Sequence, residues 1–175
     1  MKNRKKNIKL SALIIAHNEE KKLSSCLSKL ELVDEIVIVL DKTNDQSKSI
    51  SKKFTKNIYE GSWDLEGERR NFGLKKCTSD WILEIDADEH VTKDLLIEIK
   101  KEIITAKPGY FLIPFDNFIG NKRVRYGWGA SWGVSYAPRL SYKGYKKWNN
   151  KQRIHPSLNL KGKKGKLKNR INHFV

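Results

Sequence analysis

Two carboxylates separated by one residue, Asp86 and Asp88, follow directly after the apolar run 81–85. The run is typical of a buried strand, and open α/β sheets hold their ligands at the carboxyl ends of their strands. Side chains two residues apart in an extended segment point the same way, so both carboxylates could face one divalent cation with a diphosphate beyond it. The alternative interpretation is an acidic turn that only separates a strand from a helix.

The chain before position 110 alternates apolar strand patterns with amphipathic helix patterns. This alternation favours right-handed crossovers and a three-layer α/β domain around a mostly parallel sheet. Thr92 is placed to cap the last of these helices, which Pro108 and Gly109 end. The expected strands are 8–16, 35–40, 58–59 and 81–85, and the expected helices are 20–30, 47–54, 67–76 and the segment after Thr92.

The loops after the first, second and fourth strands should open on one edge of such a sheet. These loops are 17–19, 41–45 and 86–89, and each contains at least one acidic residue. The pattern therefore predicts that polar side chains distant in sequence meet in one cleft.

The pattern changes after Tyr110. One more apolar strand, 110–115, precedes a stretch rich in Gly, Trp, Tyr and Lys that has no clear helical period. We expect irregular β-structure and loops in this stretch. Trp128 and Trp132, both flanked by glycines, could stack on a sugar ring or pack against the sheet.

Charge is distributed unevenly along the 175 residues, whose net charge is +16. Residues 117–175 hold 15 of the 36 Lys and Arg and none of the 20 Asp and Glu. A basic segment of this kind is attracted to nucleic acid, anionic lipid head groups or phosphorylated glycans, or it is a solvated surface without a dedicated partner. No apolar run approaches the roughly 20 residues that span a bilayer, so we expect a soluble cytoplasmic protein. Cys26 and Cys77 lie in helical patterns and are expected to be buried thiols without a disulfide.

Four segments, in this order and spacing, resemble glycosyltransferase family 2, the nucleotide-sugar transferases with a Rossmann-like catalytic domain. They are 11–20, 37–45, 69–74 and 80–89, and the resemblance extends over about residues 8–106. The later segments 117–120, 138–140 and 153–155 are more loosely similar to the branch that adds sugars to the lipopolysaccharide inner core. The resemblance implies a nucleotide-sugar-binding part over 1–116 and, in the same domain, a basic acceptor-side and membrane-facing part over 117–175.

The resemblance also implies roles for individual residues. Asp88 would hold a divalent cation, Mg²⁺ or Mn²⁺, with Asp86 reaching the metal or the ribose, because the charge of a departing nucleoside diphosphate must be neutralised. The other implied donor-binding residues are Asn18 and Glu19 in the nucleoside pocket, Asp41 at the base, Arg70 or its rival Arg69 at the diphosphate, and Asn71. Less specific interpretations remain open: the arginines could pair with Glu66 or Glu68, Asn18 could stabilise a turn, Asp45 could cap a helix and Trp63 could anchor its loop.

A catalytic base is harder to assign, since inverting transferases usually take it as a carboxylate from the second half of the chain. The candidates are His155, which precedes Pro156 where related enzymes have His-Glu, and Asp116, the last carboxylate of the chain. A phosphate on the acceptor, or no activity at all, are the other possibilities. His173 could reach the metal or the diphosphate, or could be structural.

We therefore expect a metal-dependent inverting glycosyltransferase that uses a nucleoside-diphosphate sugar, a UDP-sugar by analogy. Its acceptor would be a lipid-linked or lipopolysaccharide-core glycan, reached from the inner face of an anionic membrane. The alternatives are a catalytically impaired or truncated homologue, a nucleotidyltransferase, and a basic nucleic-acid-binding protein, although nucleic acid is not the expected partner.

Overall fold

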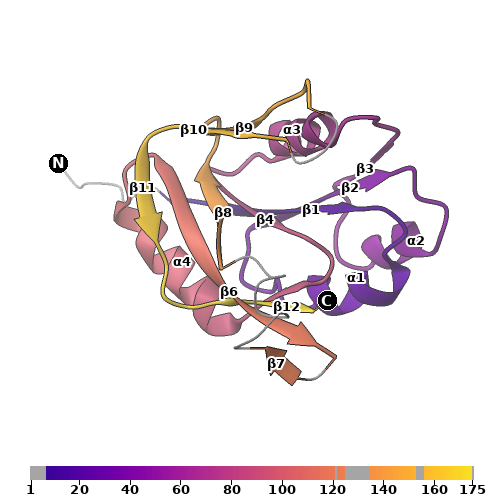
Figure 1. Ribbon diagram of the computed structural model, residues 1–175, viewed down its shortest axis with the longest axis horizontal. Coiled ribbons are helices and arrows are strands. Elements are labelled where there is room, and N and C mark those ends of the chain that lie inside the picture. The colour runs from indigo at the N-terminus through magenta and orange to yellow at the C-terminus, as the bar shows by residue number, and fades with distance from the viewer. Residues whose placement is uncertain (1–6, 121, 125–134, 153–155, 175) are drawn as a thin grey trace.

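We analysed a computed structural model of the chain, which describes residues 7–120, 122–124, 135–152 and 156–174 (Figure 1). Its first half follows the predicted alternation of strands and helices. The elements are β1 (Leu10–Ala16), α1 (Glu20–Leu27), β2 (Glu35–Asp41), α2 (Ser47–Ser51), β3 (Ile58–Gly61), α3 (Glu66–Lys76), β4 (Trp81–Ile85), β5 (Glu89–Val91) and α4 (Lys93–Thr105).

Strands β3, β2, β1 and β4 lie side by side in that order and are all parallel. The central strands β1 and β4 are buried along their whole length apart from Ile15, which is only partly buried. Helix α3 covers one face of this sheet, and α1, α2 and α4 cover the other (Figure 1). Thr92 caps α4 as predicted, since its hydroxyl accepts from the backbone N–H of Leu95 at 3.2 Å. The three-layer Rossmann-like arrangement is therefore confirmed.

The second half extends the sheet and makes it mixed. It consists of β6 (Gly109–Ile119), β7 (Lys122–Val124), β8 (Tyr136–Tyr142), β9 (Lys146–Trp148), β10 (Leu158–Leu160), β11 (Lys163–Lys166) and β12 (Ile171–Phe174). Strand β8 is antiparallel to both β4 and β6, whereas β11 and β12 are parallel to β6. Much of the stretch expected to be irregular is thus regular strand. Strand β6 runs through position 116, so the two parts proposed from the sequence share one sheet.

Two further features concern the expectations from composition. Cys26 and Cys77 are both buried and free, as expected. Within the described residues, no helix is long and apolar enough to cross a membrane.

Candidate active site

The loops after β1, β2 and β4 meet at one edge of the sheet, as the sequence predicts. The His17 ring Nδ1 lies 2.7 Å from the carbonyl oxygen of Asp41, and the Asn18 side-chain oxygen accepts from the backbone N–H of Asn44 at 2.9 Å. Asn18 has a positive φ of 54°, in the left-handed region that asparagine tolerates better than most residues. Its side chain therefore stabilises the joined loops, as the turn interpretation anticipated.

Asp86 begins a turn in which the backbone N–H of Glu89 donates to the carbonyl of Asp86 at 3.0 Å. The expectation of an extended segment is wrong here, because this hydrogen bond folds the chain back into β5. The outcome for the side chains is nevertheless similar: Ala87 is buried, whereas the side chains of Asp86 and Asp88 are each about one third exposed. Both carboxylates therefore remain partly accessible to solvent.

Two arginines hold the Asp86 carboxylate. Arg139 on β8 donates to one oxygen at 2.5 Å, and Arg70 on α3 lies 3.5 Å from the other. Burial alone would raise the pKa of Asp86, but these guanidinium groups outweigh it and lower the pKa to about 2. Asp86 is therefore ionised at neutral pH, and side chains from two elements hold its carboxylate.

Arg139 also pairs with Glu89, which is buried. The second oxygen of Glu89 accepts from the backbone N–H of Asp86 at 3.1 Å. Burial, together with the negative charge of Asp86, raises the pKa of Glu89 to about 7 in spite of Arg139. Glu89 thus stabilises the turn through the backbone of Asp86, and the Arg139 guanidinium bridges the carboxylates of Glu89 and Asp86.

Asp88 faces a different set of groups. Lys22 on α1 and His173 on β12 each approach one of its oxygens at 3.8 Å. Burial raises the pKa of Asp88, but the interaction with His173 and other nearby groups outweighs burial, so the pKa of Asp88 is below its usual value. In turn, the Asp88 carboxylate raises the pKa of His173. The structure therefore brings His173 to the acidic motif, as one of the two sequence-based interpretations proposed.

The His173 ring is held in one orientation. Its Nδ1 lies 3.0 Å from the side-chain oxygen of Asn117, which can only accept, so Nδ1 donates to that oxygen and Nε2 faces Asp88. Within the described residues, no group of three or more His, Cys, Asp or Glu is arranged to hold a metal ion. Mg²⁺, however, is commonly bound by one or two protein ligands together with substrate phosphates and water. A carboxylate oxygen beside an imidazole nitrogen fits that type of site, where a bound cation would take the place of any proton on the nitrogen.

Asp41 lies on the other side of the cleft and is almost completely buried. One oxygen accepts from the backbone N–H of Trp63 at 3.0 Å, and the other accepts from Arg69 at 2.7 Å. The Nε of Arg69 is buried and has no hydrogen-bond partner among the described residues. A buried donor without a partner is costly, so an acceptor atom of a ligand could satisfy it. Arg69 thus belongs to the Asp41 side and not to Asp86.

Arg70 lies between the acidic motif and β9. Its Nε donates to Glu66 at 2.7 Å, its Nη1 is 3.8 Å from Glu84, and its guanidinium carbon is 4.8 Å from the centre of the Trp148 ring. The pairing with Glu66 was the less specific interpretation of Arg70, and it is present. The same side chain is nonetheless close enough to Asp86 to contribute to the cleft.

Three other candidates have mainly structural contacts. The amide of Asn71 donates to the carbonyl of Trp148 at 2.8 Å and accepts from its N–H at 2.9 Å. Asp45 accepts from the N–H groups of Ser47 and Glu20, both at 2.9 Å, so it caps the start of two helices. Trp63 packs its ring 5.1 Å from that of Phe72.

Glu19 lies at the edge of the cleft. Burial, together with Asp88 and other nearby acids, raises the pKa of Glu19 despite the opposing charge of Lys22. Glu19 therefore lies near the acidic motif, and its role in a nucleoside pocket stays a prediction.

Asp116, one of the two candidate bases, is not brought to the acidic motif. Asp116 pairs with Arg123 at 2.5 Å and with Arg170 at 3.5 Å. It also precedes Asn117, whose side chain points to His173, and successive residues of a strand face opposite sides. His155, Trp128 and Trp132 lie outside the described residues.

Sequence reasoning did not single out Arg139, Glu89 or the buried pair of Glu84 and Lys146. One signal was available, because Glu84 interrupts the apolar run 81–85 and a buried charge requires a partner. The partner is 62 positions away on β9, beyond the reach of any local pattern.

The fold is the Rossmann-like fold of nucleotide-diphospho-sugar transferases. Residues 11–166 match the model of glycosyl transferase family 2. The chain belongs to that family, which confirms the resemblance seen in its motifs.

Two curated relatives illustrate the match. The lipopolysaccharide core biosynthesis glycosyltransferase LpsC of Rhizobium meliloti is 30% identical over 160 residues, which is 88% of this chain and 52% of that protein. An uncharacterized glycosyltransferase of Rickettsia felis is 31% identical over 93 residues, 53% of this chain and 33% of that protein. The chain thus spans between about a third and about half of the length of these relatives.

Solved structures support the fold. TarS 1–349 of Staphylococcus aureus superposes with a TM-score of 0.72 at 17% identity, over 95% of this chain and 60% of that one. The same protein has been solved with UDP and with UDP-GlcNAc. Glucosyl-3-phosphoglycerate synthase of Mycobacterium tuberculosis, in complex with Mn²⁺, UDP and phosphoglyceric acid, superposes with a TM-score of 0.52 at 16% identity, over 66% of this chain and 44% of that one.

Proposed function

We propose that the chain catalyses the metal-dependent transfer of a sugar from a nucleoside diphosphate to a glycan acceptor, with inversion at the sugar carbon. The observation that carries this proposal is the turn of Asp86 and Asp88 at the carboxyl edge of the sheet, with Arg70, Arg139 and His173 around it. This arrangement offers both negative ligands for a cation and positive groups for phosphate oxygens.

Asp88 and His173 are the proposed protein ligands of a divalent cation, Mg²⁺ or Mn²⁺. Asn117 keeps Nδ1 of His173 protonated, which leaves Nε2 available on the side of Asp88. When bound, the cation would neutralise charge on the departing diphosphate. Asp86 is already neutralised by two arginines, so its proposed role is to orient the ribose or an outer ligand of the ion.

Donor recognition is proposed to follow the two sides of the cleft. The buried Asp41 and the partly exposed Arg69 form an acceptor and donor pair that matches a nucleobase edge, and the unpartnered Nε of Arg69 would bind a base carbonyl. Asn18 and Glu19 would line the nucleoside pocket, while Arg70 would reach the diphosphate. Asn71 would act through β9, which it fixes. UDP is proposed as the nucleotide because structural neighbours were solved with it.

The acceptor is proposed to be a lipid-linked or lipopolysaccharide-core glycan, by similarity to LpsC. His155 is the proposed base. Asp116 is the second candidate, although it would first have to leave its two arginine partners.

We further propose that the exposed lysines of the C-terminal part bring the enzyme to an anionic membrane on its cytoplasmic face. Each Lys or Arg close to such a surface contributes roughly 1 kcal/mol. Lys161, Lys163 and Lys164, around the start of β11, are exposed and available for this contact. Binding to phosphatidylglycerol vesicles should decline steeply with salt, and salt-independent binding would contradict this role.

A thermal-shift panel tests the enzymatic proposal. UDP, GDP, CDP and ADP are each added with and without Mn²⁺ or Mg²⁺. A ligand that binds only the folded state raises the melting temperature by mass action. We expect one nucleotide to stabilise the protein only when the cation is present, and to lose this effect in Asp88→Asn. A folded sample that responds to no combination would contradict the proposal.

A further inference from the structure

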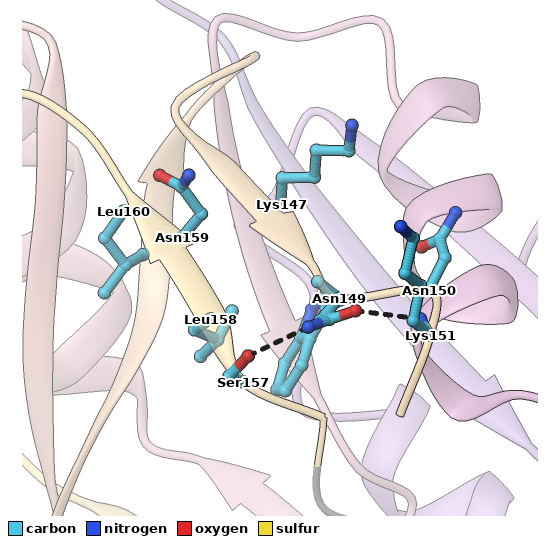
Figure 2. A pocket seen from close by; sticks show the side chains of 9 residues that line it. Lys147, Asn149, Asn150, Lys151, Ser157, Leu158, Asn159 and Leu160 are labelled. Carbon is cyan, nitrogen blue, oxygen red and sulfur yellow. Dashed lines mark hydrogen bonds between the residues drawn. The ribbon is translucent and has the colours of Figure 1, made fainter. Parts of the chain in front are cut away.

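A second concave surface lies beside the proposed donor cleft. Among the described residues, strands β9 and β10 pair only with each other and form a two-stranded ribbon, separate from the ten-stranded sheet. The ribbon borders an open hollow of about 870 Å³ (Figure 2). Lys147 and Asn159 are directly opposite each other on the two strands and are both exposed. The hollow is therefore formed by residues that the donor site does not use.

The lining of the hollow indicates the chemistry of its ligand. Lys147 and Asn159 share one face of the ribbon, and Leu158 faces the other side with Trp148, because side chains alternate along a strand (Figure 2). On the lining, the Asn149 amide donates to the Ser157 hydroxyl at 3.3 Å. Amides and hydroxyls form hydrogen bonds with sugar hydroxyls, so a polar lining beside lysines favours a glycan over an apolar ligand.

The charge of the hollow is uniformly positive. Lys147 and Lys151 line it, and among the described residues no carboxylate does. A second, adjoining hollow of about 380 Å³ shares Lys147 and adds the exposed Lys75 and Lys143, together with Lys146, whose ammonium is paired with Glu84. The exposed lysines of the two hollows attract negative charge and repel cations. The ligand class is therefore an anionic glycan, whose charge is a phosphate or a carboxylate.

The ribbon is firmly attached to the donor cleft. The Trp148 ring nitrogen donates to Glu84 at 3.2 Å, and the ring lies 4.8 Å from the guanidinium carbon of Arg70, which contacts Asp86. Gly67 of α3 permits the close approach, since a Cβ at this position would lie 2.1 Å from the carbonyl oxygen of Asn149. A glycan in the hollow would thus lie one side-chain contact from the groups that surround the acidic turn.

We propose that the β9–β10 hollow binds a negatively charged part of the acceptor glycan and so holds the acceptor next to the donor. The inference rests on the proposed transferase function, because only that function supplies a glycan acceptor. The inference says where on the protein the acceptor binds and that the acceptor carries negative charge, and the donor site defines neither of these properties.

The test measures glycan binding to the whole chain at low salt by microscale thermophoresis. The probes are pentamannose phosphate, its neutral counterpart mannopentaose, and trigalacturonic acid, which carries carboxylates only. Lys147→Gln/Lys151→Gln removes two charges from the hollow. Lys52→Gln/Lys56→Gln removes two exposed charges beside α2 and is the matched control.

We expect pentamannose phosphate, trigalacturonic acid or both to bind the wild type more tightly than mannopentaose. The hollow variant should weaken that binding about tenfold, and the control less than about twofold. Equal binding by the hollow variant and the wild type would overturn the proposal, as would a wild type that binds neither charged probe more tightly than mannopentaose.

A separate measurement distinguishes failure of this proposal from failure of the transferase proposal. The hollow variant retains every residue assigned to the donor, so UDP with Mn²⁺ should raise its melting temperature as much as that of the wild type. Lysine-dependent glycan binding without any nucleotide response would contradict the transferase proposal and leave a glycan site. A nucleotide response with lysine-independent glycan binding would contradict only the proposal for the hollow.

Discussion

Replacement of Lys146 by methionine should destabilise the protein strongly. The Lys146 ammonium is paired with Glu84 and donates to the carbonyl of Pro138 at 2.8 Å, and both side chains of the pair are almost fully buried, at 2% and 1% exposure. Burial lowers the pKa of Lys146, and the charge of Glu84 opposes that shift. Lys146→Met leaves the carboxylate of Glu84 buried without its closest cation.

The expected cost is about 3–5 kcal/mol, the usual penalty for removing one partner of a buried ion pair. Arg70, at 3.8 Å, and the Trp148 ring nitrogen, at 3.2 Å, still face Glu84, which places the expectation at the lower end, about 3 kcal/mol. A domain is stable by only about 5–15 kcal/mol, so the loss would be a large fraction of the total.

Urea unfolding followed by tryptophan fluorescence and circular dichroism measures this loss. With a slope of about 2 kcal/mol per molar urea, the midpoint should fall by about 1.5 M. The double variant Glu84→Leu/Lys146→Met is the control, because it removes both charges and should recover at least about 1 kcal/mol of the loss. A midpoint for Lys146→Met within about 0.3 M of wild type, or a double variant less stable than the single one, would refute the buried ion pair.

Three further predictions concern the turn, the ribbon and the C-terminal part. Arg139→Lys should cost about 1–3 kcal/mol in urea unfolding, because an ammonium cannot bridge Asp86 and Glu89 as the guanidinium fork does; unchanged stability would contradict this role. Gly67→Ala should destabilise by about 1–2 kcal/mol, although alanine favours helices, because its Cβ would meet the backbone oxygen of Asn149; a rise in melting temperature would show that the ribbon moves aside freely. Burial raises the pKa of Glu98, but hydrogen bonds from the backbone N–H groups of Lys168 and Asn169 lower it by more, so the net pKa is below 4.5 and the stability that Glu98 contributes is present at neutral pH and lost as pH falls below 4.5. Glu98→Gln should therefore lower the melting temperature at pH 7, and the difference between variant and wild type should be smaller at pH 3. A difference that is the same at both pH values would contradict the assignment.

The sequence predicted those features of the fold that depend on local patterns. The apolar runs of β1, β2 and β4 reflect burial on both faces of a sheet, and a buried strand needs no distant partner to be recognised. The convergence of the three loops followed from strand direction alone. The short β5 was not predicted, because it forms only when the turn at Asp86 directs the chain against β12.

Part of the site was not predictable for a physical reason. Arg139 and Asp86 are 53 positions apart, and Lys146 and Glu84 are 62 positions apart, so no periodicity connects them. His173 was considered from its residue type only, whereas its role depends on β12 pairing beside β6, which places Asn117 against Nδ1. Residues that act by long-range pairing emerge only when the sheet order is known.

The central claim is that the edge formed by Asp88 and His173 binds a divalent cation together with a nucleoside diphosphate. Electron paramagnetic resonance of Mn²⁺, titrated with the protein in the presence and absence of UDP, tests this claim directly. We expect weak Mn²⁺ binding alone, binding at least about tenfold tighter with UDP, and loss of that enhancement in Asp88→Asn and His173→Ala. Mn²⁺ binding that UDP does not enhance, or that both variants retain, would contradict the account.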